Sequence, residues 1–281
     1  MSTMISFSNN MKRMSMDEMR KKCPYAFVKT PTNPEVSEKY THANTETVIN
    51  DLEKLGWYPV DAKQCRQRKG SKGIRSFHFV ALQNDNVKIL NKNGEDEAYV
   101  RIILQNSHDG FNSFKFMVGV YRLICSNGLI VADAEFASFS IRHINYSFDE
   151  LRGIVAKVID SVPTVVTKMN TMNQTLLTDE QKYEFATEAY RIRKEIPSED
   201  KVELSKYTIE DLLNPVRCED AGNSLWNVFN VLQEKVIKGG FHASGKNGKT
   251  RRQRPITSIK KDIDYNQKLW QAAEKYMSVA V

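Results

Sequence analysis

The chain has 281 residues, of which 41% are hydrophobic and 27% charged, and its formal net charge is +7. This composition excludes a chain that is disordered throughout, and the length suits one large or two small domains. No stretch approaches the ~20 apolar residues of a membrane span, and the N-terminal residues lack the order of a secretory signal, so we expect a cytoplasmic protein.

The first part of the chain predicts an arm with two short helices near it. Residues 1–43 are rich in Met, Ser, Thr and Pro, and one helix is expected at Met16–Lys22. Asn44–Gly56 begins with a polar residue, carries apolar residues at helical spacing and ends in glycine. These are the start and stop signals of a second short helix.

Between Trp57 and Ile144 the pattern changes to strands separated by Gly, Asn and Asp clusters. The links are too short for helical crossovers, so the sheet is predicted to be antiparallel. Lys69–Gly73 is expected to be a basic hairpin tip and Ser107–Ser113 the turn between two long strands. The expected strands, rich in β-branched and aromatic residues, are Arg75–Leu82, Ala98–Leu104, Ser113–Ile124 and Phe136–Ile144.

Helices dominate the rest of the chain. Ser147–Glu150 and Thr178–Gln181 are capping boxes, in which the first and fourth residues bond each other's backbone. Thr208–Asp211 is expected to open a shorter helix, and two glycines stop the helix that follows it. The helices expected from these signals and from apolar periodicity begin at Leu151, Glu180 and Thr208, then span Asn223–Lys238 and Asp262–Met277.

This order of elements predicts an α+β fold, with an N-terminal antiparallel β-sheet and flanking helix followed by a largely α-helical C-terminal half. We expect an N-terminal arm over 1–43, a core of antiparallel sheet plus long helix over 44–168, and a helical region with a basic loop, packed on the core, over 169–281. Strands followed by a long helix are also similar to the core of single-strand annealing proteins.

Two basic blocks concentrate the positive charge. Lys63–Arg75 carries six basic residues and no acidic one, and Lys235–Lys261 carries nine and none, which leaves the other residues at −2 (+7 minus 9). Such blocks indicate a polyanionic partner more than a solvated face, and nucleic acid is the simplest polyanion. The residues expected to contact nucleic acid are Arg66, Arg68, Lys69, Lys72, Arg75, Arg142, Lys246, Lys249, Arg251, Arg252 and Arg254.

The segment Arg251–Lys261 (RRQRPITSIKK) is followed by a predicted helix, so it is not a tail. We expect the loop Phe241–Lys249 to lead into an anchored basic segment. Arg254 is expected to be held in the fold, while Arg251 and Arg252 face a partner. Four aromatic residues near the basic blocks are candidates for stacking on exposed bases, although core packing explains most of them equally well: Phe77, Phe79, Phe241 and Trp270.

Five stretches have combinations of residues that core packing alone does not require. They are SHDG (Ser107–Gly110), YRLICSNGL (Tyr121–Leu129), IRH (Ile141–His143), the helix region Arg217–Glu234 with its ED and LW pairs, and the basic segment with Asn266–Trp270 downstream. In this order they resemble the family called domain of unknown function 932, carried by phages and plasmids. The resemblance covers residues 45 to 275, with mild departures at Lys235, Val236 and Lys238. It implies a mobile-element origin and no particular chemistry.

For several residues in these stretches, a structural role is an alternative to a functional one. Arg122, in an apolar strand, needs a carboxylate or phosphate, and a structural ion pair with Asp109, Glu219 or Asp220 is favoured. Asn127 begins a turn dipeptide. Arg142 and His143 face opposite sides of one strand, with Arg142 on the more polar side. A buried hydrogen-bond network or a contact surface is indicated for Trp226, Asn230 and Gln233, and packing is favoured.

An enzyme would need a cluster of acid, base or metal-binding groups. His108, Asp109, His143, Glu219 and Asp220 are the candidates, but no HExxH, P-loop or GxSxG motif accompanies them. No catalytic residue, metal or cofactor is therefore assigned. The leading hypothesis is a non-catalytic protein that binds single-stranded DNA in replication or annealing-type recombination. Homo-oligomerisation would fit this hypothesis. The alternatives are an anti-defence protein that binds a host protein or nucleotide signal, and a metal-dependent enzyme.

Overall fold

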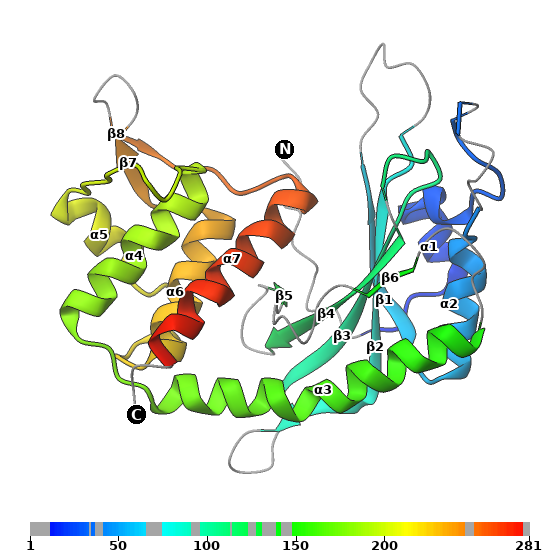
Figure 1. Ribbon diagram of the computed structural model, residues 1–281, viewed down its shortest axis with the longest axis horizontal. Helices are drawn as coiled ribbons and strands as arrows, with labels where there is room; N and C mark the ends of the chain where they lie inside the picture. Colours follow the sequence, from blue (N-terminus) through cyan, green and yellow to red (C-terminus); the bar gives the residue numbers. More distant parts are fainter. Residues whose placement is uncertain are drawn as a thin grey trace. The chain divides into compact units, whose positions relative to one another are not determined.

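The computed structural model describes residues 12–33, 35–36, 42–65, 75–90, 96–112, 114–122, 128–130, 139–141, 148–244 and 250–277 (Figure 1). The chain divides into two compact units. We call the one within residues 7–162 the sheet unit and the one within residues 163–281 the helical unit. A single long helix, α3 (Phe148–Gln174), has residues in both.

The sheet unit is built on one antiparallel sheet in which consecutive strands are neighbours in the order β1-β2-β3-β4-β5, while β6 also pairs with β4. Antiparallel pairing follows from the short links between strands. Val80 pairs with Leu104 and Leu104 with Phe116, so the apolar positions of three strands stand in one row. The strands are β1 (Tyr58–Gln64), β2 (His78–Leu90), β3 (Asp96–Asn106), β4 (Phe114–Arg122), β5 (Gly128–Ile130) and β6 (Phe139–Ile141).

Short helices complete the sheet unit: α1 (Met16–Lys22), the 3-10 turn η1 (Pro24–Phe27) and α2 (Thr45–Lys54). The Asn44 side chain caps α2 by accepting from the amides of Glu46 and Thr47. Consecutive residues of β2 from Phe79 to Leu82 are all fully buried, so both faces of this strand are covered.

The helical unit is arranged around α6 (Leu225–Lys238), which contacts α4, α5 and α7. Of its 14 residues 12 are buried, which is the burial of a central helix with neighbours on most sides. Its other elements are α4 (Asp179–Lys194), α5 (Lys206–Leu213), the 3-10 turn η2 (Cys218–Asp220), β7 (His242–Ser244), β8 (Thr250–Arg252) and α7 (Ile259–Met277).

The predicted α+β fold class is confirmed, and so are the helix at Met16–Lys22 and the capping box of α4 between Thr178 and Gln181. Other details were wrong. The strand β1 was not named, and β2 runs to Leu90 rather than ending at Leu82. The cap of α5 is Ser205, three residues before the expected Thr208.

Candidate nucleic-acid interface

The arginine segment, residues 251–256, has its backbone fixed on the helical unit. The amide of Gly240 donates to the Gln253 carbonyl at 2.9 Å, and the amide of Gln253 donates to the Phe241 carbonyl at 2.8 Å. The amide of Ile256 donates to the Ile237 carbonyl at 2.8 Å. These bonds continue the β7–β8 pairing past the end of the strands, and they hold the chain against the end of α6.

Two glycines make this close approach possible. Gly239 ends α6 with φ +70° and ψ −141°, a backbone conformation that L side chains rarely adopt. A Cβ atom there would lie 2.5 Å from the Gln253 carbonyl oxygen and 2.8 Å from that of Arg254. At Gly240 only the φ of +91° favours glycine, because a Cβ atom there would lie at an ordinary contact distance of 3.7 Å from the Arg252 guanidinium.

The last turn of α4 also supports the segment. The Arg193 guanidinium donates to the Arg254 carbonyl, and the Lys194 ammonium donates to the Gln253 side-chain oxygen at 2.7 Å. Burial lowers the pKa of Arg193, and burial together with the charge of Arg193 lowers the pKa of Lys194. Two cations therefore stand behind the segment and add to its positive potential.

Three arginine side chains of the segment are exposed: Arg251, Arg252 and Arg254. Within the described residues none of them forms an ion pair, whereas nearby Lys261 pairs with Glu195 at 2.8 Å. Arg252 donates through Nε to the Gly240 carbonyl at 3.2 Å. The expectation that Arg254 is held in the fold is right for its backbone and wrong for its side chain, because only its carbonyl is anchored.

An aromatic pair that was not predicted from the sequence lies next to this segment. Tyr207, in the first turn of α5, is 58% exposed, and its ring centroid lies 5.9 Å from that of His242 in β7. Both the backbone amide and Nδ1 of His242 contact the Asp211 carboxylate oxygen Oδ2, at 2.6 and 2.8 Å. Lys235 lies 3.8 Å from the other oxygen of Asp211.

The aromatic residues considered for base stacking do not reach solvent. Phe79, Phe241 and Trp270 are fully buried, and Phe77 is 8% exposed, so core packing accounts for all four. In the sheet unit, exposed Arg75 instead stacks on the exposed ring of Phe111, with the guanidinium carbon 4.1 Å from the ring centroid.

Most of the first basic block and the loop between β7 and β8 lie outside the described residues. This applies to Arg66, Arg68, Lys69, Lys72, Lys246 and Lys249, and also to Asn127, Arg142 and His143. Arg122 ends β4, where it pairs with Ala98 of β3, and its side chain is not described.

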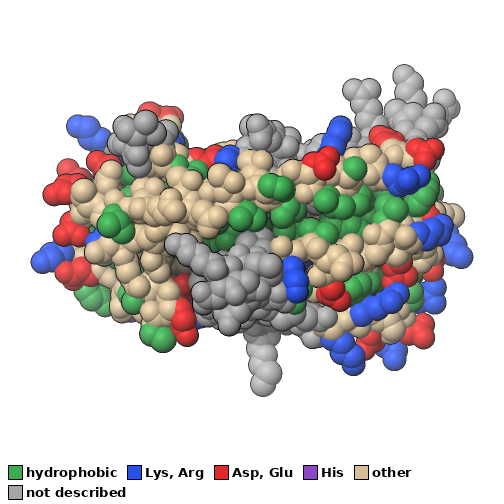
Figure 2. Space-filling view, turned by 90° about the horizontal axis from the view of Figure 1, so that it is seen from below, with side chains coloured by type: hydrophobic (Ala, Val, Ile, Leu, Met, Phe, Trp, Pro, Cys, Tyr) green, Lys and Arg blue, Asp and Glu red, His purple; other side chains and the backbone are tan. Residues whose placement is uncertain are grey.

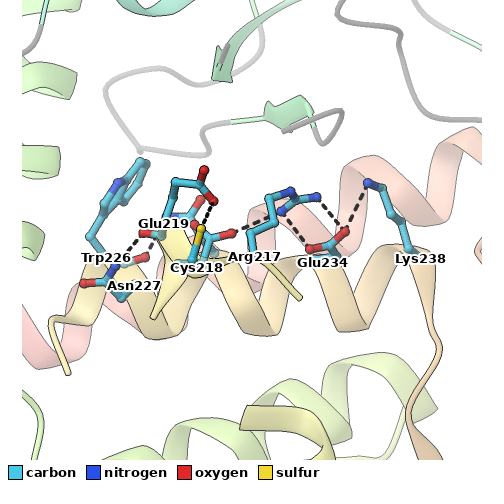
Figure 3. A network of polar contacts seen from close by, with 9 residues as sticks. Arg217, Cys218, Glu219, Trp226, Asn227, Glu234 and Lys238 are labelled. Atoms are coloured by element: carbon cyan, nitrogen blue, oxygen red, sulfur yellow. Dashed lines mark hydrogen bonds and ion pairs between the residues drawn. The ribbon is translucent and has the colours of Figure 1, made fainter. Parts of the chain in front are cut away.

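Asp220 belongs to an ion-pair network on η2 and α6, and Glu219 beside it joins the surrounding polar contacts (Figure 3). Arg217 donates to Glu234 through both terminal nitrogens, at 2.8 and 2.7 Å, and to Asp220 at 3.1 Å. Lys238 donates to Glu234 at 3.2 Å. Glu219 is exposed, and the hydrogen bonds from its own amide and from the Cys218 thiol lower its pKa. The buried carboxylates are thus compensated by cations, which is a structural arrangement.

The polar residues on α6 also bond within the unit. Asn230 donates to the Trp226 carbonyl at 2.6 Å, and Gln233 donates to Asn266 of α7 at 2.7 Å. The Trp226 and Phe229 rings stack at 5.9 Å. This geometry matches the packing interpretation of Trp226, Asn230 and Gln233.

His108 and Asp109 form a buried turn in the sheet unit. Asp109 accepts from the amides of Ser76 at 3.1 Å and Phe111 at 3.0 Å, and the amide of His108 donates to the Ser76 hydroxyl at 2.7 Å. The SHDG stretch therefore fastens the β3–β4 turn to the start of β2. Across the described residues no group of three His, Cys, Asp or Glu side chains has a geometry that could hold a metal ion.

Next to this turn, burial lowers the pKa of His78 from 6.5 to about 4, so the neutral ring is the folded form. Its Nε2 lies 2.8 Å from the Thr45 hydroxyl. Because the folded protein resists protonation, stability is fully present above pH 6.5 and falls as the pH drops toward 4. Urea unfolding at pH 7 and pH 4.5 should show wild type losing about 2–3 kcal/mol more than the His78→Asn variant.

The control for this pH dependence is Gly153→Ala in α3, which changes no titratable group. It should show the same loss between the two pH values as wild type. Equal losses in wild type and His78→Asn would contradict the proton linkage at His78.

Away from the arginine segment, exposed side chains of both charge signs lie near one another. On the face drawn in Figure 2, Lys and Arg side chains alternate with Asp and Glu, and hydrophobic side chains show between them. Exposed pairs of the helical unit, such as Lys268–Asp264 and Lys206–Glu210, also bring opposite charges together. A surface that mixes both signs has little attraction for a polyanion. The arginines of β8 differ from it, because they form no ion pair with any of the described residues.

No helix among the described residues is long and apolar enough to cross a membrane.

The sequence model of the family "Domain of unknown function (DUF932)" matches residues 34–270. The chain is 29% identical to UPF0380 protein YafZ of Escherichia coli (strain K12) over 244 residues, which are 86% of this chain and 84% of the relative. It is 27% identical to UPF0380 protein YfjQ of the same strain over 242 residues, with the same coverage. No solved structure matches significantly.

Proposed function

The chain belongs to the DUF932 family, and we propose that this member binds nucleic acid, with single-stranded DNA the favoured ligand. The observation that carries the proposal is a set of exposed arginines that form no ion pair within the part of the chain that the structure describes: Arg251, Arg252 and Arg254. Such side chains bind phosphates and release the counterions that surround a nucleic acid, which gives a favourable and salt-dependent free energy.

The fixed backbone of the segment supports the same proposal. Its hydrogen bonds to Gly240, Phe241 and Ile237 set the spacing of the three arginines before a ligand arrives. The half-buried cations Arg193 and Lys194 add positive potential behind it. In this proposal the protein acts in the cytoplasm, in replication or annealing-type recombination of a phage or plasmid.

The test is a titration of labelled oligothymidylate over a range of salt concentrations. Wild type should bind at low salt, with an affinity that falls steeply as salt rises. Changing Arg251, Arg252 and Arg254 together to serine should remove about three phosphate contacts. The slope of log K against log salt should then become shallower by about 2.

A matched control also removes three positive charges, but at exposed lysines outside the segment. It changes Lys157, Lys268 and Lys275 to serine. This variant should keep a slope close to that of wild type. Absence of binding by wild type at low salt would overturn the proposed function, and equal effects of the two triple variants would show that only net charge matters.

A further inference from the structure

Tyr207 presents an aromatic ring to solvent beside the arginine segment. The residue belongs to the first turn of α5, where its neighbours Thr208 and Ile209 point into the core and are buried. Its ring is 58% exposed and meets His242 at a centroid distance of 5.9 Å and an interplanar angle of 48°. The Tyr207 hydroxyl lies 3.5 Å from Nδ1 of His242, so the two rings meet through this edge, and the exposed surface of the Tyr207 ring is left to a ligand.

His242 is fixed in one orientation. Asp211 receives both the backbone amide and Nδ1 of His242 on a single carboxylate oxygen. A histidine that donates from Nδ1 to a carboxylate has a defined tautomer and ring plane. Lys235 balances the charge of Asp211 from α6, so the carboxylate adds little repulsion toward a phosphate. The aromatic pair is therefore built from a supported ring and an exposed one.

Strand pairing aligns this pair with an arginine. His242 stands directly opposite Arg252 in the β7–β8 ladder, and directly opposed residues of an antiparallel pair project on the same face. Tyr207, His242 and Arg252 thus form a row of phenol, imidazole and guanidinium groups.

We infer that Tyr207 and His242 form a stacking site for an unpaired nucleobase, while Arg252 binds the adjoining phosphate. This inference rests on the proposed function and extends it, because it assigns the preference for single strands to specific residues. Stacking needs a base whose face is accessible, and duplex DNA offers none along its length. Phosphate binding by Arg251 and Arg254 does not distinguish the two forms.

The experiment compares Tyr207→Leu and Tyr207→Phe on three labelled ligands: oligothymidylate, an abasic oligomer of the same length and a duplex. Tyr207→Leu should weaken oligothymidylate binding about 10-fold at every salt concentration, with an unchanged salt slope. Its binding to the abasic oligomer and the duplex should equal that of wild type. Tyr207→Phe keeps the ring and should bind oligothymidylate within about 2-fold of wild type.

Tyr183→Leu is the matched control, because Tyr183 is another tyrosine of the helical unit and is 45% exposed. It should bind all three ligands as wild type does. The inference is overturned if Tyr207→Leu binds oligothymidylate normally, if it weakens the abasic oligomer equally, or if Tyr207→Phe loses as much as Tyr207→Leu. Wild type that binds oligothymidylate and the abasic oligomer equally well also overturns it and leaves the proposed function intact. Wild type that binds none of the ligands overturns both.

Discussion

Replacing Gly239 with alanine should lower the free energy of unfolding by about 3 kcal/mol or more. The backbone at Gly239 has a positive φ and a ψ of −141°, which strains any residue with a Cβ atom. The added methyl group would also lie within 3 Å of two carbonyl oxygens of the arginine segment. These are backbone atoms held by hydrogen bonds, so they can move only if the segment leaves the end of α6.

Urea unfolding measures this loss, and Gly153→Ala is the matched control. Gly153 lies inside α3, and a Cβ atom added there would meet nothing within 4 Å. The control should be stabilised by about 0.5–1 kcal/mol, because alanine loses less conformational entropy in a helix. A Gly239→Ala variant as stable as wild type would contradict the close packing of Gly239 against the segment.

The second large effect is expected at Arg217. Changing Arg217 to methionine should destabilise the protein by about 2–4 kcal/mol, because it leaves two buried carboxylates without their main cation. Asp220 is 2% exposed and Glu234 is 7% exposed, and Lys238 is the one cation among the described residues that would still pair with Glu234. Thermal and urea unfolding of the purified variant would measure the change.

Two further variants test whether the loss at Arg217 comes from its buried ion pair. Lys268→Met breaks the exposed pair with Asp264 and should cost less than about 0.5 kcal/mol. The double variant Arg217→Met with Glu234→Met should lose less than the sum of its single variants, because neither charge is then left alone. Additive losses would show that Arg217 and Glu234 do not stabilise each other.

The elements that the sequence predicted well are those with local signals. The box at Thr178 and Gln181 and the double glycine after α6 act within four residues, and the structure has both features. The cap of α5 was placed wrongly because Ser205 and Thr208 are both good caps, and their side chains also bond each other at 3.0 Å. The strand β1 was missed because Pro59 breaks its pattern and a register shift lies between Pro59 and Asp61.

The candidate interface was predictable only in part. The exposure of the arginines was predictable, because residues 251–254 contain three charged residues and no apolar one. The Tyr207–His242 pair joins residues 35 positions apart, and neither has a distinctive neighbour in the sequence. Local composition likewise could not separate exposed aromatic residues from buried ones, since Phe241 follows two glycines yet is fully buried. Contacts between helices and hairpins decide such cases.

The backbone bonds of the arginine segment have a consequence for the entropy of binding. A flexible basic tail loses conformational freedom in every residue that a ligand orders, and that loss opposes association. Here the amides of Gly240, Gln253 and Ile256 are already bonded, so the main chain loses its freedom during folding. When a ligand binds, only the arginine side chains need to become ordered, at a cost of about 0.5–1.5 kcal/mol for each.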